Sequence, residues 1–300
     1  MAVSPKLLSI LGPTASGKSD LALALARQTG SQILSADSMQ VYRGMDIGTA
    51  KLTPAQRATV IHHLIDIVDP TESFTVAKFV ELADSIIATA KSPLIIAGGT
   101  PLYYKSLFEG LFDGPPADES IRQRLRTADP ADLHARLAAV DPQAAARIHL
   151  NDRKRLIRAL EVYELTGRPI SSFQTDWESG HSRHPATWIG LSWDREALNR
   201  RINARVKSMI ESGWLDETRS LLQHHGQLSP TASEATGYRE LIEHLHGRLS
   251  LEDAIEQIKI ATRQLARRQM KWLKRFPNVH WIAGDAPLES QVTEVLARWP

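Results

Sequence analysis

Short apolar runs bounded by polar or turn residues recur along the chain and predict the strands of a buried sheet. They occupy residues 7–11, 32–36, 93–97 and 187–191, and residues 62–66 resemble a further strand at a sheet edge. Between 74 and 90 the apolar residues recur with helical periodicity instead. Strands that alternate with helices are typical of an α/β fold in which helices flank a parallel sheet.

The middle of the chain shows a different pattern. Residues 110–116, rich in Gly and Pro, are the clearest linker signal. After them, helical segments follow one another without a strand, at 119–126, 131–140, 142–147 and 152–165. We therefore expect a helical insertion over 117–185 in an α/β core formed by 1–116 and 186–300. From residue 195 onward the pattern is helical again and includes a long helix over 251–276.

The first strand leads directly into a glycine loop that matches G-x-x-x-x-G-K-[ST] and precedes a helix. Its residues are Gly12, Pro13, Thr14, Ala15, Ser16, Gly17, Lys18 and Ser19. A strand, this loop and a helix in that order are the context that a phosphate-binding P-loop requires. Backbone N–H groups would surround an anion at the positive end of the helix, with the Lys18 ammonium beside it and the Ser19 hydroxyl able to bind Mg²⁺. The motif indicates a di- or triphosphate site and leaves open which of the two is bound.

Polar residues at the ends of two other strands add candidate chemistry. Asp37 follows the second strand, and Gly98, Gly99 and Thr100 follow the strand at 93–97. Because ligands gather at the carboxyl ends of strands in α/β folds, Asp37 is a candidate base or metal ligand. The two glycines would let the backbone approach a ligand closely beside the Thr100 hydroxyl. A nucleotide-hydrolysing P-loop protein would carry an acid at such a strand end, so this pattern argues against a motor or switch.

Composition excludes several kinds of chemistry. The chain of 300 residues has no cysteine, which rules out disulfides, thiol catalysis and cysteine-ligated metal centres. The adjacent His62 and His63 would point in different directions, so we expect no metal pair there. No apolar run approaches the length of a membrane span, and no signal peptide is apparent. These features lead us to expect a cytoplasmic protein.

Basic residues are clustered although the formal net charge of +2 is nearly neutral. The clusters are Arg153, Lys154, Arg155 and Arg158 in the insertion, Arg201 and Arg205 four residues apart, and Arg263, Arg267, Lys271 and Lys274 along one stripe of the long helix. Most such clusters are solvated helix faces. Basic faces in a chain that also carries a phosphate site nevertheless favour a polyanionic partner such as nucleic acid.

Seven blocks of sequence carry a more specific resemblance. They are residues 12–19, 35–38, 42–51, 98–103, 151–161, 237–239 and 262–269, and they extend over nearly the whole chain. In this combination they resemble the tRNA dimethylallyltransferase family. Plant-type adenylate isopentenyltransferases share the P-loop and the strand-end aspartate, but they would explain the insertion and the basic blocks less well.

The resemblance implies transfer of a dimethylallyl group from dimethylallyl diphosphate to N6 of the adenosine immediately 3′ of a tRNA anticodon. It implies that the P-loop and Arg205 hold the diphosphate of the prenyl donor, with Mg²⁺ as cofactor at Ser19. Asp37 would be the general base for the N6 amine, and Thr100 would lie beside that amine. Since diphosphate is the leaving group, the loop would stabilise charge that grows in the transition state.

The same resemblance implies a set of tRNA-binding residues. They are Asp37, Ser38, Met39, Gln40 and Thr100 at the adenine, Arg122, Lys154, Arg155, Leu156, Ile157 and Arg158 in the insertion, and Arg263 and Arg267 on the long helix. The adenosine would be flipped out, because a stacked base cannot present its amine to a buried electrophile. The family often has Arg or Gln at the position of Glu234, where an acid would repel phosphate, so Glu234 is left out of the site.

Three alternatives stay open at this point. The same chemistry could act on a free adenine nucleotide, and a P-loop core with a helical lid also describes a nucleotide kinase. A non-catalytic RNA-binding module is the third alternative, but it would not need Lys18, Ser19 and Asp37 together. A phosphotransfer assay separates the kinase from the others. We expect a monomer that has no membrane partner.

Overall fold

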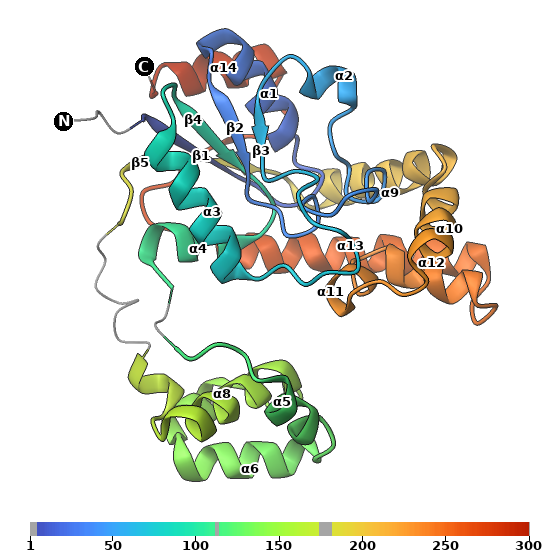
Figure 1. Ribbon diagram of the computed structural model, residues 1–300. Coiled ribbons are helices and arrows are strands. Elements are labelled where there is room, and N and C mark those ends of the chain that lie inside the picture. Colours follow the sequence, from blue (N-terminus) through green and yellow to red (C-terminus); the bar gives the residue numbers. More distant parts are fainter. Residues whose placement is uncertain (1–4, 112–113, 174–181, 300) are drawn as a thin grey trace. The chain divides into compact units, whose positions relative to one another are not determined.

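A computed structural model describes residues 5–111, 114–173 and 182–299. Its contacts divide the chain into two compact units (Figure 1). The larger unit comprises Met1–Phe108 and His184–Pro300, and the helical unit comprises Glu109–Arg183. The linker expected at 110–116 is therefore grouped with the helical unit, so this unit begins earlier than the 117–185 range that the sequence pattern predicts.

In the described part of the larger unit, six parallel strands form one sheet in the order β3-β2-β4-β1-β5-β6. The strands that the apolar runs predict are β1 (Leu7–Leu11), β2 (Gln32–Ser35), β4 (Leu94–Ala97), β5 (Ala186–Ser192) and the short edge strand β3 (His62–His63). In the sheet, β4, β2 and β3 lie on one side of β1, and β5 and β6 lie on the other side. The carboxyl end of β1 is thus at the point where the strand order reverses, which is where α/β sheets bind ligands.

The sixth strand, β6 (His280–Ala283), differs from the expectation that the chain is helical after residue 195. Of its four residues only Ile282 is buried, so β6 lacks the continuous apolar run that marks the other strands. It pairs in parallel with β5, and the helix α14 (Leu288–Leu296) follows it. Pairing with a neighbouring strand, a non-local interaction, therefore creates this element.

Helices cover both faces of the sheet. In Figure 1, α1 (Lys18–Thr29) and α14 lie on one side of it, and α3 (Val76–Thr89), α4 (Pro101–Glu109) and α13 (Leu251–Leu273) lie on the other. Leu21 and Leu25 of α1 pack with Ile10, Ile95 and Val295 in one buried cluster. No helix in the described residues is long and apolar enough to cross a membrane.

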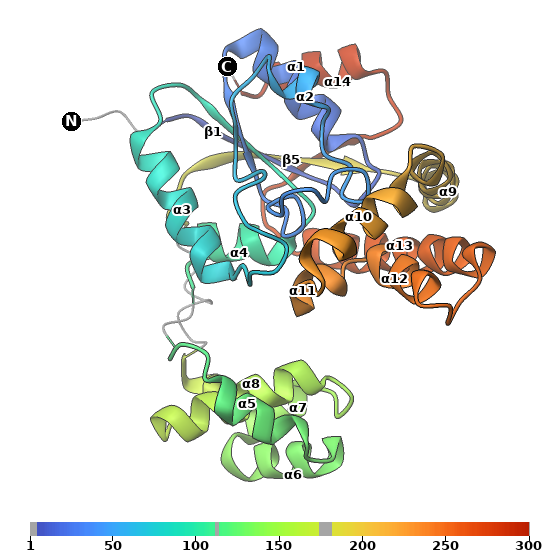
Figure 2. The same cartoon turned by 45° about the vertical axis from the view of Figure 1, so that its right-hand side comes forward.

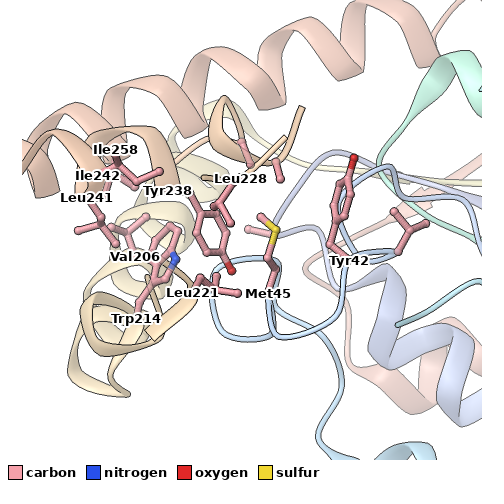
Figure 3. Packing of buried hydrophobic residues seen from close by; sticks show 14 of the residues in the cluster. Tyr42, Met45, Val206, Trp214, Leu221, Leu228, Tyr238, Leu241, Ile242 and Ile258 are labelled. Atoms are coloured by element: carbon pink, nitrogen blue, oxygen red, sulfur yellow. The ribbon is translucent and has the colours of Figure 1, made fainter. Parts of the chain in front are cut away.

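The C-terminal half of the larger unit adds a group of helices beside the sheet (Figure 2). They are α9 (Arg195–Glu211), α10 (Trp214–His225), α11 (Pro230–Ser233), α12 (Tyr238–Leu245) and α13, which ends at Leu273 rather than at residue 276. Figure 3 shows Met45, from the loop that follows β2, among Trp214, Leu221 and Tyr238 of these helices. The short helix α2 (Pro54–Arg57) lies further along the same connection.

The helical unit contains α5 (Glu119–Arg126), α6 (Pro130–Val140), α7 (Pro142–Arg147), α8 (Arg153–Thr166) and the 3₁₀ helix η1 (Ile170–Phe173). An aspartate caps the start of each α-helix by accepting a hydrogen bond from a backbone N–H of the first turn, namely Asp118, Asp129, Asp141 and Asp152. Leu125, Leu133 and Leu156 lie in its buried core. Capping and an apolar stripe explain why the sequence pattern places these helices nearly correctly.

Tyr104 of α4 connects the helix layer to the sheet below the site. Its hydroxyl is 2.9 Å from the Ile10 carbonyl oxygen on β1 and 3.3 Å from that of Ile96 on β4. Burial raises the pKa of Tyr104, so the hydroxyl keeps its proton and donates. We expect Tyr104→Phe to lower the free energy of unfolding in urea by about 1 kcal/mol, because it removes a buried donor at almost constant volume.

Tyr42 provides a matched control for this prediction. It is also fully buried, but its hydroxyl has no hydrogen-bond partner among the described residues. Tyr42→Phe should therefore leave the free energy of unfolding unchanged or raise it. Equal losses in the two variants would show that the Tyr104 hydrogen bond does not stabilise the sheet.

Candidate active site

The glycine loop between β1 and α1 is held by side chains that bind its carbonyl groups. Lys18 Nζ donates to the Pro13 oxygen at 3.1 Å, Arg201 Nε to the Ala15 oxygen at 2.7 Å, and Trp193 Nε1 to the Ser16 oxygen at 3.0 Å. Ala15 and Gly17 have φ values of 63° and 91°, so the loop turns through the left-handed region twice. A loop whose carbonyls are bound in this way is suited to direct backbone N–H groups at an anion.

The ends of β1, β2 and β4 meet beside this loop. A Cβ atom on Gly99 would lie 3.4 Å from Asp37 Oδ2 and 3.8 Å from Lys18 Nζ. Burial lowers the pKa of Lys18 to about 8. The charge of Asp37 opposes this shift, and the charge of Arg205 adds to it. Burial also lowers the pKa of Arg205 on α9, while Asp37 raises it. The fold thus brings Lys18, Asp37 and Arg205 into one electrostatically coupled site.

Hydrogen bonds fix the Asp37 carboxylate at the end of β2. Its Oδ1 accepts from the Met39 N–H at 2.9 Å and more weakly from the Gln40 N–H at 3.4 Å. Thr100 Oγ1 accepts from the Ser38 N–H at 3.0 Å and lies 3.2 Å from Ser38 Oγ. Thr100 therefore holds the turn that carries Asp37, while Oδ2 of Asp37 lies on the side of Gly99.

The loop after β2 is joined to the site through Gln40. Its Nε2 donates to the Thr49 carbonyl at 3.2 Å, and its Oε1 accepts from Ser35 Oγ at 3.3 Å. Met39 is partly buried and packs against the cluster that contains Tyr42. The side chains expected to lie at the adenine, Met39 and Gln40, thus also take part in the packing of this loop.

Glu217 of α10 holds the same loop from the other side, a role that the sequence analysis missed. Its carboxylate accepts from the N–H groups of three successive residues, 46, 47 and 48, at 2.9, 2.7 and 3.2 Å, and from Tyr238 Oη at 2.6 Å. In sequence, Glu217 looks like an ordinary acid in the first turn of a helix. The three backbone partners are about 170 residues away and Tyr238 is 21 residues away, so no local pattern marks Glu217.

The donor set at the P-loop fits a Mg²⁺ ion shared with a bound phosphate. Ser19, the second residue of α1, contributes one hydroxyl next to Lys18. Among the described residues no group of three or more His, Asp or Glu side chains could hold a metal ion. Mg²⁺ in phosphate-transferring sites is commonly held by one or two protein oxygens together with phosphate and water oxygens, which matches what Ser19 can supply.

In the helical unit, the residues expected to bind tRNA differ in exposure. Lys154 and Arg155 are exposed near the start of α8, with Arg155 beside Asp152 at 3.4 Å. Leu156 and Ile157 are buried in the core of the unit. Their side chains lie on the inner face of an amphipathic helix and pack against the unit itself, so a role of Leu156 and Ile157 in binding tRNA stays a prediction.

Arg122 and Arg158 are both bound to Glu161, whose side chain is fully buried. Glu161 Oε1 accepts from Arg122 Nε at 2.8 Å and from the Asp118 N–H at 2.7 Å, and Oε2 accepts from Arg158 at 2.6 Å. Burial alone would raise the pKa of Glu161, but these hydrogen bonds outweigh it and lower the pKa. Both guanidinium groups thus neutralise a buried carboxylate, whatever contact they also make with an external anion.

The basic residues along one stripe of α13 also differ in exposure and in their partners. Arg263 donates to Asn203 Oδ1 of α9 at 2.6 Å and is half-buried, whereas Arg267 and Lys271 are exposed. Glu234 is exposed at the C-terminal end of α11. Arg267 is therefore the more accessible of the two α13 residues expected to bind tRNA.

Comparison with known proteins identifies the family. A family model described as IPP transferase matches residues 40–276, and one described as isopentenyl transferase matches residues 5–64. The chain belongs to the IPP transferase family. A tRNA dimethylallyltransferase of Geobacter metallireducens is 45% identical to it over 298 residues, which cover 97% of this chain and 96% of the relative. One of Symbiobacterium thermophilum is also 45% identical, with 98% and 96% covered.

Solved structures show the same likeness over the whole length of this IPP transferase. The tRNA isopentenylpyrophosphate transferase of Bacillus halodurans has a TM-score of 0.73 and 38% identity, with 98% of this chain and 95% of that chain covered. A eukaryotic dimethylallyltransferase solved while acting on tRNA has a TM-score of 0.82 and 27% identity, with 99% and 81% covered. These likenesses and the parallel sheet confirm the α/β P-loop core that the sequence predicts, and the chain is an enzyme of this family.

The lowered pKa of Lys18 generates a prediction about anion binding. An anion at the P-loop favours protonated Lys18, so affinity should be highest below about pH 8 and fall as the pH rises through the pKa of the free protein. We expect calorimetric titration with inorganic pyrophosphate to show a loss approaching tenfold per pH unit above that value.

Lys18→Arg is the control, because a guanidinium stays charged throughout this range. Its pyrophosphate affinity should lack the Lys18-dependent decline, so the ratio of parent to variant affinity should fall above about pH 8. The ratio also cancels the ionisation of pyrophosphate itself. A ratio that stayed constant with pH would contradict a role for the Lys18 ammonium in holding the anion.

The buried ion-pair cluster generates a stability prediction for the helical unit. Glu161→Gln should lower the free energy of unfolding by about 3 kcal/mol in urea, because it leaves two guanidinium groups without their carboxylate. Since the folded-state pKa of Glu161 is lowered, its stabilising effect is present above the unfolded pKa of about 4.3 and is lost as the pH falls through the folded pKa. The glutamine variant should lack this part of the acid dependence.

Glu119→Gln serves as the matched control, since the Glu119 carboxylate is exposed and its pair with Arg126 lies in solvent. It should change stability by less than about 0.5 kcal/mol. If the two glutamine variants were equally stable, the Glu161 cluster would not hold the unit together.

The same cluster makes Arg155 a better probe of tRNA binding than Arg158, because Arg158→Ala would also disturb folding.

Proposed function

We propose that this IPP transferase transfers a dimethylallyl group from dimethylallyl diphosphate to N6 of the adenosine immediately 3′ of a tRNA anticodon. The observation that carries the proposal is the meeting of a P-loop, two buried cations and the Asp37 carboxylate at the ends of β1, β2 and β4. The names of the full-length relatives support tRNA as the acceptor over a free nucleotide, and support prenyl transfer over phosphoryl transfer.

On the donor side, the loop N–H groups, Lys18 and Arg205 bind the diphosphate. As the bond between the prenyl C1 and the diphosphate oxygen breaks, negative charge grows on that oxygen, and these groups stabilise it. Because Trp193 and Arg201 already hold the loop through the carbonyls of Ser16 and Ala15, its N–H groups need little reorganisation during the reaction. Mg²⁺, bound by Ser19 and diphosphate oxygens, would add positive charge at the leaving group.

On the acceptor side, Asp37 orients the N6 amine and accepts its proton. An exocyclic amine is a weak nucleophile because its lone pair is delocalised into the ring, so a positioned carboxylate is needed while the N6–C1 bond forms. Oδ1 of Asp37 is bound by the Met39 N–H, which leaves Oδ2 to take the proton. Thr100 and Ser38 fix this turn and lie where they can hydrogen-bond the flipped base.

Exposed cations outside the catalytic centre would position the tRNA. Lys154 and Arg155 of the helical unit and Arg267 of α13 are suited to phosphate contacts, which fix register but carry no sequence information. We further propose that the enzyme acts as a monomer. Because its proposed substrate is tRNA, we also propose that it acts in the cytoplasm.

Mass spectrometry of tRNA nucleosides tests the proposed function. After incubation with dimethylallyl diphosphate and Mg²⁺, an unmodified tRNA should yield N6-dimethylallyladenosine in the anticodon-loop fragment. Parallel incubations with AMP or ATP as acceptor should give no prenylated nucleotide. Prenylation of the free nucleotide in place of tRNA, or phosphate transfer from ATP, would overturn the proposal in favour of one of the two alternatives.

Asp37→Asn tests whether Asp37 acts as a general base or only positions the acceptor amine. The amide keeps the size of the side chain and can still hydrogen-bond the amine, but it accepts no proton. We expect the single-turnover rate of prenyl transfer to fall by about 10²–10⁴-fold, with a much smaller change in tRNA affinity.

Asp285→Asn, at an exposed position near the C-terminal helix, controls for the loss of one carboxylate. It should transfer at the parental rate. An Asp37→Asn variant with near-parental transfer would mean that the carboxylate only positions the base and that the proton leaves through water.

A further inference from the structure

Gln269 of α13 joins two segments of the active site that follow the neighbouring strands β1 and β4. Its side chain is buried, with 7% of its surface exposed. Oε1 accepts from the Thr14 N–H in the P-loop at 2.8 Å, and Nε2 donates to the Gly99 carbonyl after β4 at 2.6 Å. A backbone N–H can only donate and a carbonyl can only accept, so the neighbours fix the orientation of this amide.

The Gln269 side chain lies next to the groups that we propose bind the diphosphate and accept the proton. A Cβ atom on Gly99 would lie 2.8 Å from Gln269 Nε2, as well as near Asp37 Oδ2 and Lys18 Nζ. On the Gly99 side the connection continues, because the neighbouring Thr100 binds Ser38 beside Asp37. On the Thr14 side it continues into the loop that precedes Lys18. One carboxamide thus connects the anion-binding side of the site to the carboxylate side.

We propose that Gln269 is a positioning residue that sets the P-loop against the turn carrying Asp37, and so sets the donor diphosphate against the acceptor amine. This inference rests on the proposed function for the identity of donor and acceptor. For this role the side chain must offer an acceptor to the Thr14 N–H and a donor to the Gly99 carbonyl at a fixed separation. Reactions that join two bound groups lose rate steeply when the groups are misplaced, because the reacting atoms must be held at near-contact distance.

The donor–acceptor requirement distinguishes substitutions by chemistry. Leucine is similar in size but leaves both the Thr14 N–H and the Gly99 carbonyl without a partner. Ionised glutamate still accepts from Thr14 but places a second acceptor against the Gly99 carbonyl. Protonated glutamate has one O–H donor and one carbonyl acceptor, which restores the pattern of the native amide. Gln269→Glu should therefore depend on pH in a way that a purely space-filling residue would not.

The experiment measures two quantities for the parent, Gln269→Leu, Gln269→Glu and Gln257→Glu between about pH 5.5 and pH 8, the range in which a buried glutamic acid titrates. The first is pyrophosphate affinity by calorimetry, and the second is the single-turnover rate of prenyl transfer to tRNA. Gln257 is exposed on the same helix, so Gln257→Glu adds the same charge without touching the site. Thermal unfolding shows whether each variant is folded.

We expect Gln269→Leu to bind pyrophosphate about 10-fold more weakly and to transfer at least 10-fold more slowly at every pH, since two buried polar groups lose their partners. Gln269→Glu should match the leucine variant at high pH and recover toward the parent as the pH falls. Gln257→Glu should follow the parent throughout. The leucine variant also separates lost positioning from simple repulsion, because it carries no charge.

Parental behaviour of folded Gln269→Leu would overturn the inference, and so would a Gln269→Glu variant without recovery at low pH. If Gln269→Leu does not fold, the pH dependence of the glutamate variant decides alone. A parent that binds pyrophosphate but does not prenylate tRNA would disprove the proposed function instead. The pyrophosphate affinities would then still show whether Gln269 sets the P-loop.

Discussion

The close approach of β2 and β4 at their carboxyl ends is the constraint on which the site depends. A Cβ atom on Gly98 would lie 2.1 Å from the Ala36 carbonyl oxygen, a distance that no side chain tolerates. Because Gly98 has no side chain, the Ala36 N–H can reach the Ala97 carbonyl at 2.9 Å and the Thr100 N–H can reach the Ala36 carbonyl at 3.2 Å. Asp37 is thereby placed beside Gly99 and within the electrostatic reach of Lys18.

The P-loop and the Asp37 carboxylate come from the first hundred residues, but side chains from the C-terminal half of the chain hold this part of the site in place. Trp193, Arg201 and Gln269 bind backbone groups of the P-loop, and Glu217 binds the loop after β2. These contacts satisfy polar groups that would otherwise be partly buried without partners, and they fix conformations that include the left-handed Ala15. Preorganisation of this kind is what electrostatic stabilisation of a leaving group requires.

In the helical unit, a buried carboxylate decides how the basic residues are used. Glu161 binds Arg122 and Arg158, and Arg153 donates to backbone carbonyls near the end of α5. Lys154 and Arg155 remain exposed on the outer face of α8. A cluster that looks uniform in sequence therefore contains both structural cations and cations suited to phosphate, because helix geometry turns consecutive residues in different directions.

Local patterns in the sequence determined the strands β1, β2, β4 and β5, the capped helices of the insertion, the P-loop and the strand-end position of Asp37, because apolar runs, caps and glycine loops are properties of neighbouring residues. Only the tertiary structure decided that β6 forms against β5, that Leu156 and Ile157 face inward, and that Glu217 and Gln269 hold the site. The backbone groups that Glu217 and Gln269 bind lie about 170 or more residues away along the chain. A single carboxylate or carboxamide on a helix looks the same in sequence whether it is solvated or bridges two loops, so its role depends on contacts that only folding creates.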